Sequence, residues 1–345
     1  MTAFRASRAG FLTIAAAFTA APSMADVPDE VAFDLHSSLS MNLHHRLYRL
    51  GEIAFAISRG TTLSAMPPSR WLTRARALQA EFDALPVDAR GALRPAIQAY
   101  ATSGLADGNL LDHPRLTAVA KALSATADSA DPPAESFPRA VRAALGAAAA
   151  AYRSTWWPAD DAANRAWIGA VRPRVARYGA RIASRLRAAW REPWPLGPYR
   201  VDVVRYANFF GGYTITGPVH TTISSGDPTY RGDAALEMLY HEASHGVVTP
   251  DYGVVGRALE DAATRLRVPE PDGLWHAIIF FTAGSIVARL LRDDGVAYVP
   301  YADANGTYSG GWARYREVLG AAWQPYLDGR VALEAAIADV VRAAA

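Results

Sequence analysis

The segment His241-Glu242-Ala243-Ser244-His245 holds the residue types needed for metal-assisted water chemistry. An α-helix has 3.6 residues per turn, so side chains four residues apart project from the same face and can hold one metal ion. Zinc at such a site lowers the pKa of a bound water molecule toward neutrality. A neighbouring carboxylate can then accept a proton from that water during attack on a carbonyl. The spacing therefore indicates zinc ligands at His241 and His245, with Glu242 as the base.

The residues around the motif predict the helix that this geometry requires. The helix is expected over residues 232–245, with Asp233 as a candidate N-cap and no proline inside it. Its apolar stripe consists of Leu236, Leu239 and Ala243. Gly246 follows the second histidine and is typical of a helix end. The motif is thus predicted to lie near the C-terminal end of a short amphipathic helix.

Residues 199–291 resemble the catalytic core of a zincin metallopeptidase, in which strands precede the motif helix and a later helix supplies a third zinc ligand. Two strands are expected, over residues 199–207 and 212–225, because both segments are rich in β-branched and aromatic residues. Gly211 and Gly212 separate them. The resemblance covers about a quarter of the 345 residues and depends on the five-residue motif. It implies a zinc-dependent hydrolase, a peptide or protein substrate and a third zinc ligand.

Three residues compete for the third ligand position. His276 opens the apolar segment 274–291, which is expected to be a buried helix, and a buried imidazole needs a partner. In the gluzincin pattern, the third ligand is a glutamate on the helix that follows the motif. Glu260 is available on such a predicted helix, but the rest of the gluzincin signature is absent. Asp251 stands where metzincins have a histidine. We favour His276. A set of three histidines also suits copper, nickel or iron, which leaves the identity of the metal open.

Two tyrosines are candidates for stabilising negative charge in the transition state. Zincins often use a tyrosine or histidine for this purpose, and the Gly-rich loop 298–312 follows the predicted ligand helix. Its residues Tyr301 and Tyr308 are therefore candidate catalytic residues, although such aromatic residues also commonly pack over a core. His220 lies in the second predicted strand, where a solvent-facing position is favoured over a position in the cleft.

Two further clusters of basic residues have simpler interpretations. His36, His44 and His45 lie near the start of the chain, where a second metal site is conceivable but ordinary packing is favoured. Four arginines recur every three or four residues along a predicted helix: Arg174, Arg177, Arg181 and Arg185. This spacing is typical of a solvated helix face.

The first 25 residues have the pattern of a cleavable signal peptide. Arg5 and Arg8 precede the apolar segment 11–21, which is too short for a permanent membrane anchor. Small residues at 23–25 predict cleavage after Ala25, with an uncleaved anchor as the alternative. The chain has no cysteine, which excludes disulfides and thiol catalysis. Together these features predict a bacterial protein of the periplasm or the extracellular medium.

Composition indicates a sizeable hydrophobic core and gives no sign of nucleic acid as a partner. Hydrophobic residues make up 51% of the chain, which is enough for a sizeable core, and the net charge is +2. No basic cluster interleaved with aromatic residues indicates binding to nucleic acid. Segment 274–291 contains His276 and Arg289, so a core helix is favoured over a permanent membrane span.

The expected fold class is α+β and predominantly α-helical. Residues 1–25 form the predicted signal peptide, 26–195 a helical region and 196–345 a zincin-like catalytic domain with a small sheet and closing helices. The boundary is placed at 195 because three prolines in residues 191–198 prevent the preceding helix from continuing.

The favoured function is a secreted or periplasmic zinc metallopeptidase in which Glu242 activates water. A first alternative is a non-catalytic zincin-like binding protein of the bacterial envelope. A second is a structural protein in which the five-residue motif is accidental.

Overall fold

A small mixed sheet joins the beginning of the chain to its middle. The computed structural model describes residues 32–345 apart from 64–65, 67–68, 107–112, 195–197, 209, 218 and 250–252. The predicted signal peptide and the cleavage site after Ala25 therefore lie outside the described residues. The strands are β1 (Phe33–His36), β2 (Tyr199–Val204), β3 (Gly212–Ile215) and β4 (His220–Ser224), in the sheet order β1-β2-β4-β3.

Only one pair of neighbouring strands in the sheet, β3 and β4, is antiparallel. β1 pairs with β2 and β2 pairs with β4 in parallel, whereas β3 and β4 form an antiparallel pair. The single strand expected over residues 212–225 is thus wrong, because a turn divides this segment into β3 and β4. Gly217 lies in that turn with φ +86°, a conformation that residues with a side chain rarely adopt.

Helices from the first half of the chain cover one face of the sheet. They are α1 (Leu39–Ser58), α2 (Arg70–Asp83), α3 (Val87–Thr102), the 3₁₀ turn η1 (Ala134–Ser136), α4 (Pro114–Ser124) and α5 (Arg139–Ser154). Ser38 caps α1 by accepting a hydrogen bond from the backbone of Met41. The buried side chains of α1 and α3 pack in one cluster with Val204, Tyr213 and Ile215 of the sheet.

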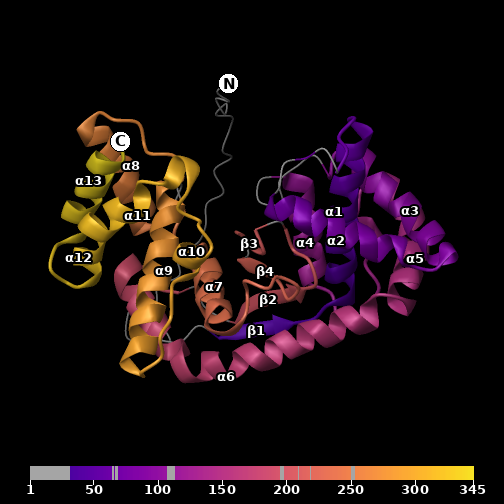
Figure 1. Cartoon of the computed structure of the whole chain (residues 1–345), viewed down its shortest axis with the longest axis horizontal. Coiled ribbons are helices and arrows are strands. Elements are labelled where there is room, and N and C mark those ends of the chain that lie inside the picture. The colour runs from indigo at the N-terminus through magenta and orange to yellow at the C-terminus, as the bar shows by residue number, and fades with distance from the viewer. Residues whose placement is uncertain are drawn as a thin grey trace, which may run out of the picture.

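The long helix α6 (Trp157–Trp190) runs beneath both halves of the molecule (Figure 1). It ends at Trp190, and the C-cap residue Arg191 has a φ of 53°, in the left-handed region, before the proline-rich segment. Trp190 is buried, and its indole N–H donates to the hydroxyl of Ser244 over 3.2 Å. α6 therefore connects the N-terminal helices to the helices that follow the sheet.

The C-terminal part of the chain is built around one buried helix, α9 (Leu274–Asp293). The surrounding elements are α7 (Gly232–Ser244), α8 (Val254–Leu266), α10 (Tyr301–Ala304), η2 (Gly310–Trp312), α11 (Tyr315–Val318), η3 (Leu319–Trp323), α12 (Gln324–Leu327) and α13 (Leu333–Ala344). Among the described helices, α9 alone has the length and composition of a membrane span, and 78% of its most apolar window is buried within the protein. Each fully buried Ile or Phe of such a helix contributes about 1.5–3 kcal/mol to folding.

The expected fold class is confirmed, because the chain is predominantly helical with one small mixed sheet. The division at residue 195 remains a prediction, since residues 195–197 are not described. The sheet nevertheless contains strands from both predicted segments. Its opposite face, which includes Val201, Val203 and Ile223, packs against α6 and α7. The candidate site is thus formed on a sheet to which both segments contribute.

Candidate metal centre

Helix α7 presents the five-residue motif at its C-terminal end. It begins at Gly232 after the N-cap residue Arg231 and ends at Ser244, with His245 as the C-cap residue. The expectation that Asp233 is the N-cap is wrong. Asp233 lies in the first turn, where its carboxylate suits the positive end of the helix dipole and accepts a 3.0 Å hydrogen bond from Arg174. The predicted apolar stripe is buried, which fixes the rotation of the helix.

The side chains of His241, His245 and His276 converge. One ring nitrogen of each lies within 4.8 Å of the corresponding nitrogens of the other two. Nε2 of His241 and Nε2 of His276 are 3.2 Å apart. Two nitrogens bound to one tetrahedral zinc, at zinc–nitrogen distances of about 2.0–2.1 Å, are separated by about 3.3 Å. The donor set and its spacing therefore fit zinc, and His276 rather than a carboxylate is the third candidate ligand.

Aromatic rings hold His276 in place at the beginning of α9. The imidazole stacks on Trp275 and on Phe280, at centroid distances of 5.1 and 4.9 Å, and meets the edge of Trp312 at 5.6 Å. Burial lowers the pKa of His276 to about 4. The pKa of His241 is also well below its usual value, because of burial first and then the neighbouring histidines. The neutral imidazole that results is the form that binds a metal.

Glu242, the residue that follows His241, is buried. Its Oε2 accepts a 2.8 Å hydrogen bond from the hydroxyl of Thr214 in β3. Burial raises the pKa of the Glu242 carboxyl to about 8, while the bond from Thr214 acts in the opposite direction. A bound cation would also lower this pKa, because it favours the charged carboxylate. A carboxyl tuned between these effects suits proton transfer near neutral pH.

The chain passes Glu242 at a point where no side chain fits. A Cβ on Gly212 would lie 2.9 Å from Oε1 of Glu242, and Gly211 has φ +104°. Asp227, next to Gly211, is ion-paired with Arg74 of α2 and accepts a 2.9 Å hydrogen bond from the backbone of Thr229. The N-terminal helices thus help to hold the loop beside Glu242. Sequence reasoning missed these residues, although the Gly-Gly pair was a visible signal of close backbone approach.

The two candidate tyrosines occupy different environments. Tyr301 is buried, its hydroxyl lies 3.3 Å from the hydroxyl of Thr229, and its ring stacks on Phe280 at 6.2 Å. The hydroxyl of Tyr308 lies 3.5 Å from the carbonyl oxygen of Ala277, the residue that follows His276. That distance is at the limit of a hydrogen bond. The catalytic role expected for either tyrosine remains a prediction.

Glu237, which sequence reasoning did not single out, is buried one helical turn before His241. Its Oε2 accepts hydrogen bonds from the hydroxyl of Tyr298, over 2.7 Å, and from the backbone N–H of Tyr301, over 3.0 Å. Burial raises the pKa of Glu237 to about 7. This carboxyl therefore connects α7, which carries His241 and His245, to the loop 298–312 that contains both candidate tyrosines.

Of the other candidate ligands, Glu260 does not join the three histidines. Glu260 is exposed on α8, and Asp251 lies outside the described residues. Over the described part of the chain, His241, His245 and His276 form the only group of three or more potential ligands with this spacing. The structure therefore favours His276 over Glu260 as the third ligand.

The remaining histidines have partners within the protein. His44 and His45 are buried and bond through ring nitrogens to the hydroxyls of Tyr100 and Tyr213, at 2.7 and 2.9 Å. His36 lies 3.0 Å from a carboxylate oxygen of Asp128. These contacts agree with the packing role expected for the N-terminal cluster.

The expectation that His220 faces solvent is wrong. His220 is 1% exposed, and its Nε2 lies 2.7 Å from a carboxylate oxygen of Asp202 on the neighbouring strand. Alternation in a strand indicates which residues share a face but not which face is covered, and here the N-terminal helices cover the face that carries His220.

The site thus combines three convergent imidazoles, a buried carboxyl and an aromatic surround, an arrangement suited to binding a metal and moving a proton. Comparison with protein-family models, with curated proteins and with solved structures finds no match to this chain.

Proposed function

We propose that this protein is a zinc-dependent hydrolase that acts on peptides or proteins. The observation that supports the proposal best is the convergence of His241, His245 and His276 beside the buried carboxyl of Glu242. A pair of histidines alone would fit many surface helices. A third imidazole from α9, 35 residues further along the chain and 3.2 Å from the first, completes a set of three nitrogens that one ion could bridge.

The three histidines would hold zinc through neutral imidazole nitrogens. When bound, zinc lowers the pKa of water and polarises a carbonyl. Glu242 accepts a proton from the attacking water and delivers it to the leaving amine, and Thr214 holds the carboxyl in the orientation for both transfers. Gly212 leaves the space next to Oε1 open. Burial of the site strengthens each of these electrostatic interactions.

The proposed location is the bacterial periplasm or the extracellular medium, on the basis of the signal-peptide pattern in residues 1–25. Both compartments permit a protein without cysteine and provide access to peptide substrates. This location belongs to the proposal and is tested separately, by N-terminal sequencing of the secreted protein.

Substitution of Glu242 by Gln tests the catalytic part of the proposal. The amide keeps the size of the side chain but cannot accept the proton, so we expect hydrolysis of a fluorescence-quenched peptide library to fall by about 10²–10⁴-fold. Zinc content should remain at the wild-type level. Glu260→Gln, on the exposed surface of α8, is the matched control and should leave the rate unchanged.

Two results would contradict the proposal. Unchanged hydrolysis in Glu242→Gln would exclude this carboxyl as the base. Stoichiometric zinc in a wild-type protein that hydrolyses no member of the library, and still binds peptides, would favour the non-catalytic binding protein.

A further inference from the structure

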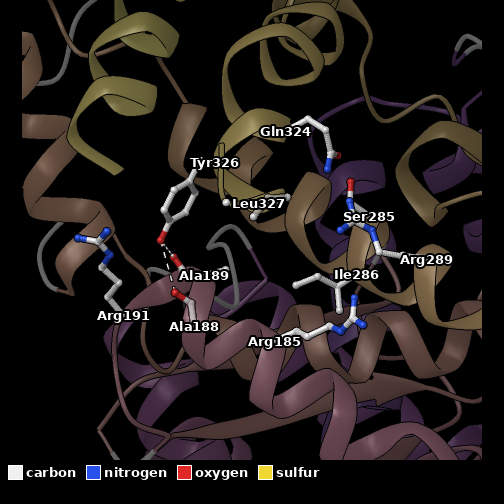
Figure 2. Close-up of a pocket in the computed structure, with 11 residues that line it drawn as sticks. Arg185, Ala188, Ala189, Arg191, Ser285, Ile286, Arg289, Gln324, Tyr326 and Leu327 are labelled. Carbon is white, nitrogen blue, oxygen red and sulfur yellow. Dashed lines mark hydrogen bonds between the residues drawn. The ribbon is translucent and has the colours of Figure 1, made fainter. Parts of the chain in front are cut away.

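A pocket lies between α6, α9 and α12, away from the three histidines of the candidate metal centre. Its volume is about 350 Å³, within the range of sites for small ligands. Figure 2 shows Arg185, Ile286 and Arg289 on one side of this pocket and Tyr326 on the other. The hydroxyl of Tyr326 donates to the carbonyl of Ala189 over 2.8 Å, and this bond holds the tyrosine ring in position at the side of the pocket.

The arginines of α6 show why this pocket is unusual. The expectation that Arg174, Arg177, Arg181 and Arg185 form a solvated face is confirmed, and three of them also make surface ion pairs. The first pairs with Asp233, and the next two pair with Asp294. Arg185 continues the same stripe but lines the pocket, and it has no ion pair or hydrogen bond with another described residue. Its charge is therefore available to a ligand.

The rest of the lining supplies further donors and an apolar surface. Ser285 also has no hydrogen-bond partner among the described residues, so its hydroxyl is available. Arg289 and Arg191 are ion-paired with Asp328 and Glu334, both outside the lining, which leaves Arg185 as the uncompensated cation among the lining residues. Ile286 and Leu327 contribute aliphatic surface beside these donors. The lining contains three arginines and no acidic residue.

The pocket is distinct from the candidate metal centre. Ile286 follows His276 by ten residues on α9, which corresponds to about 15 Å along the helix axis. A small molecule in the pocket would therefore not reach the three histidines. This separation makes the pocket a second binding site rather than a part of the proposed peptide site.

We infer that this pocket binds a small carboxylate with an apolar body. The guanidinium of Arg185 and the hydroxyl of Ser285 would bind the carboxylate, because a guanidinium matches the two oxygens of this group. Ile286, Leu327 and the ring of Tyr326 would cover the apolar body. The inference does not depend on the proposed hydrolase activity.

Calorimetric titration with benzoate, and with benzamide as its neutral counterpart, tests this inference on the full-length mature protein. We expect benzoate to bind at least tenfold more tightly than benzamide. Arg185→Gln should weaken benzoate binding about tenfold, because it removes a charge-assisted interaction. Arg181→Gln, one turn earlier on α6 and paired with Asp294, is the matched control and should change the affinity less than twofold.

Carboxylates also bind zinc, so the titration is repeated with His276→Ala. Retained benzoate binding in this variant, together with weaker binding in Arg185→Gln, would support the second site. Binding that disappears in His276→Ala, or that is unchanged in Arg185→Gln, would overturn the inference. Equal affinities for benzoate and benzamide would overturn it as well.

Discussion

Two groups of histidines lie on opposite sides of the same sheet, and they differ in what their ring nitrogens face. On the α1 side, His44, His45 and His220 each bond to a tyrosine hydroxyl or a carboxylate. On the α7 side, the ring nitrogens of His241, His245 and His276 converge on one another. The first group bonds to single protein groups, whereas the second brings three ring nitrogens within 4.8 Å of one another, close enough to share one metal ion.

Burial has the same electrostatic effect on both groups. It lowers the pKa of His45 to about 4 and that of His276 to about 4. Low pKa values therefore do not distinguish a ligand from a packing residue. The arrangement of the neighbours does, because ring nitrogens that converge on one another can share a metal ion, whereas ring nitrogens that face a hydroxyl or a carboxylate are already bonded to it. This difference between the two groups can be tested by substitution.

The largest expected effect is the loss of zinc in His276→Ala. Removal of one of three ligands should lower zinc affinity by more than about 100-fold, since loss of an outer-shell partner alone costs 10–100-fold. Elemental analysis should then show about one zinc per wild-type chain and little in the variant. His45→Gln and Glu260→Ala should both retain zinc, because neither side chain belongs to the convergent group.

The controls decide whether the comparison holds. If Glu260→Ala loses zinc and His276→Ala keeps it, the third ligand has been assigned to the wrong helix. If a well-folded wild type takes up no zinc, the convergence of the three imidazoles has no metal-binding role.

A smaller effect is expected on the α1 side, in the pH dependence of stability. The folded pKa of His45, about 4, lies below its unfolded value of about 6.5, so the unfolded chain binds the proton more tightly. The stability associated with neutral His45 is fully present above pH 6.5 and is lost as pH falls toward 4. The difference corresponds to roughly 3 kcal/mol.

Urea unfolding of wild type and His45→Gln between pH 7.5 and 4.5 measures this contribution. The difference in unfolding free energy between the two should shrink as the pH falls, because Gln does not titrate. The comparison between variants is needed because Glu237 shifts in the opposite sense, its pKa being raised to about 7. A difference that is constant across this range would show that His45 is not held in its neutral form.

Much of the site was predictable because it depends on local periodicity. The spacing of His241 and His245 determines that both face one side of α7, and the apolar run after His276 predicts a buried helix. Residues brought together by the tertiary fold were not predictable in the same way. Thr214 reaches Glu242 because β3 folds back beside β4, and no local pattern in the sequence encodes that contact.

The errors have a similar origin. His220 was expected to face solvent because strand alternation gives two faces and does not identify the covered one. The ion pairs of the arginine stripe on α6 were not predicted, because the acidic partners Asp233 and Asp294 belong to other segments of the chain. In both cases the missing information was the position of a distant segment, which periodicity within one element does not contain.

The smallest expected effect separates the two candidate tyrosines of the loop after α9. The Tyr308 hydroxyl makes only a 3.5 Å contact with the backbone oxygen of Ala277, beside His276, so little is lost if it donates its proton to negative charge at the site instead. Tyr308→Phe should therefore lower kcat by about 10–100-fold, near the lower end of the range for loss of an oxyanion donor. The Tyr301 hydroxyl is placed against Thr229, and Tyr301→Phe should lower kcat less than about threefold. Steady-state kinetics with zinc content verified in both variants makes the comparison. Equal losses in the two variants would indicate that the loop acts through packing, whereas a larger loss in Tyr301→Phe would reverse the assignment.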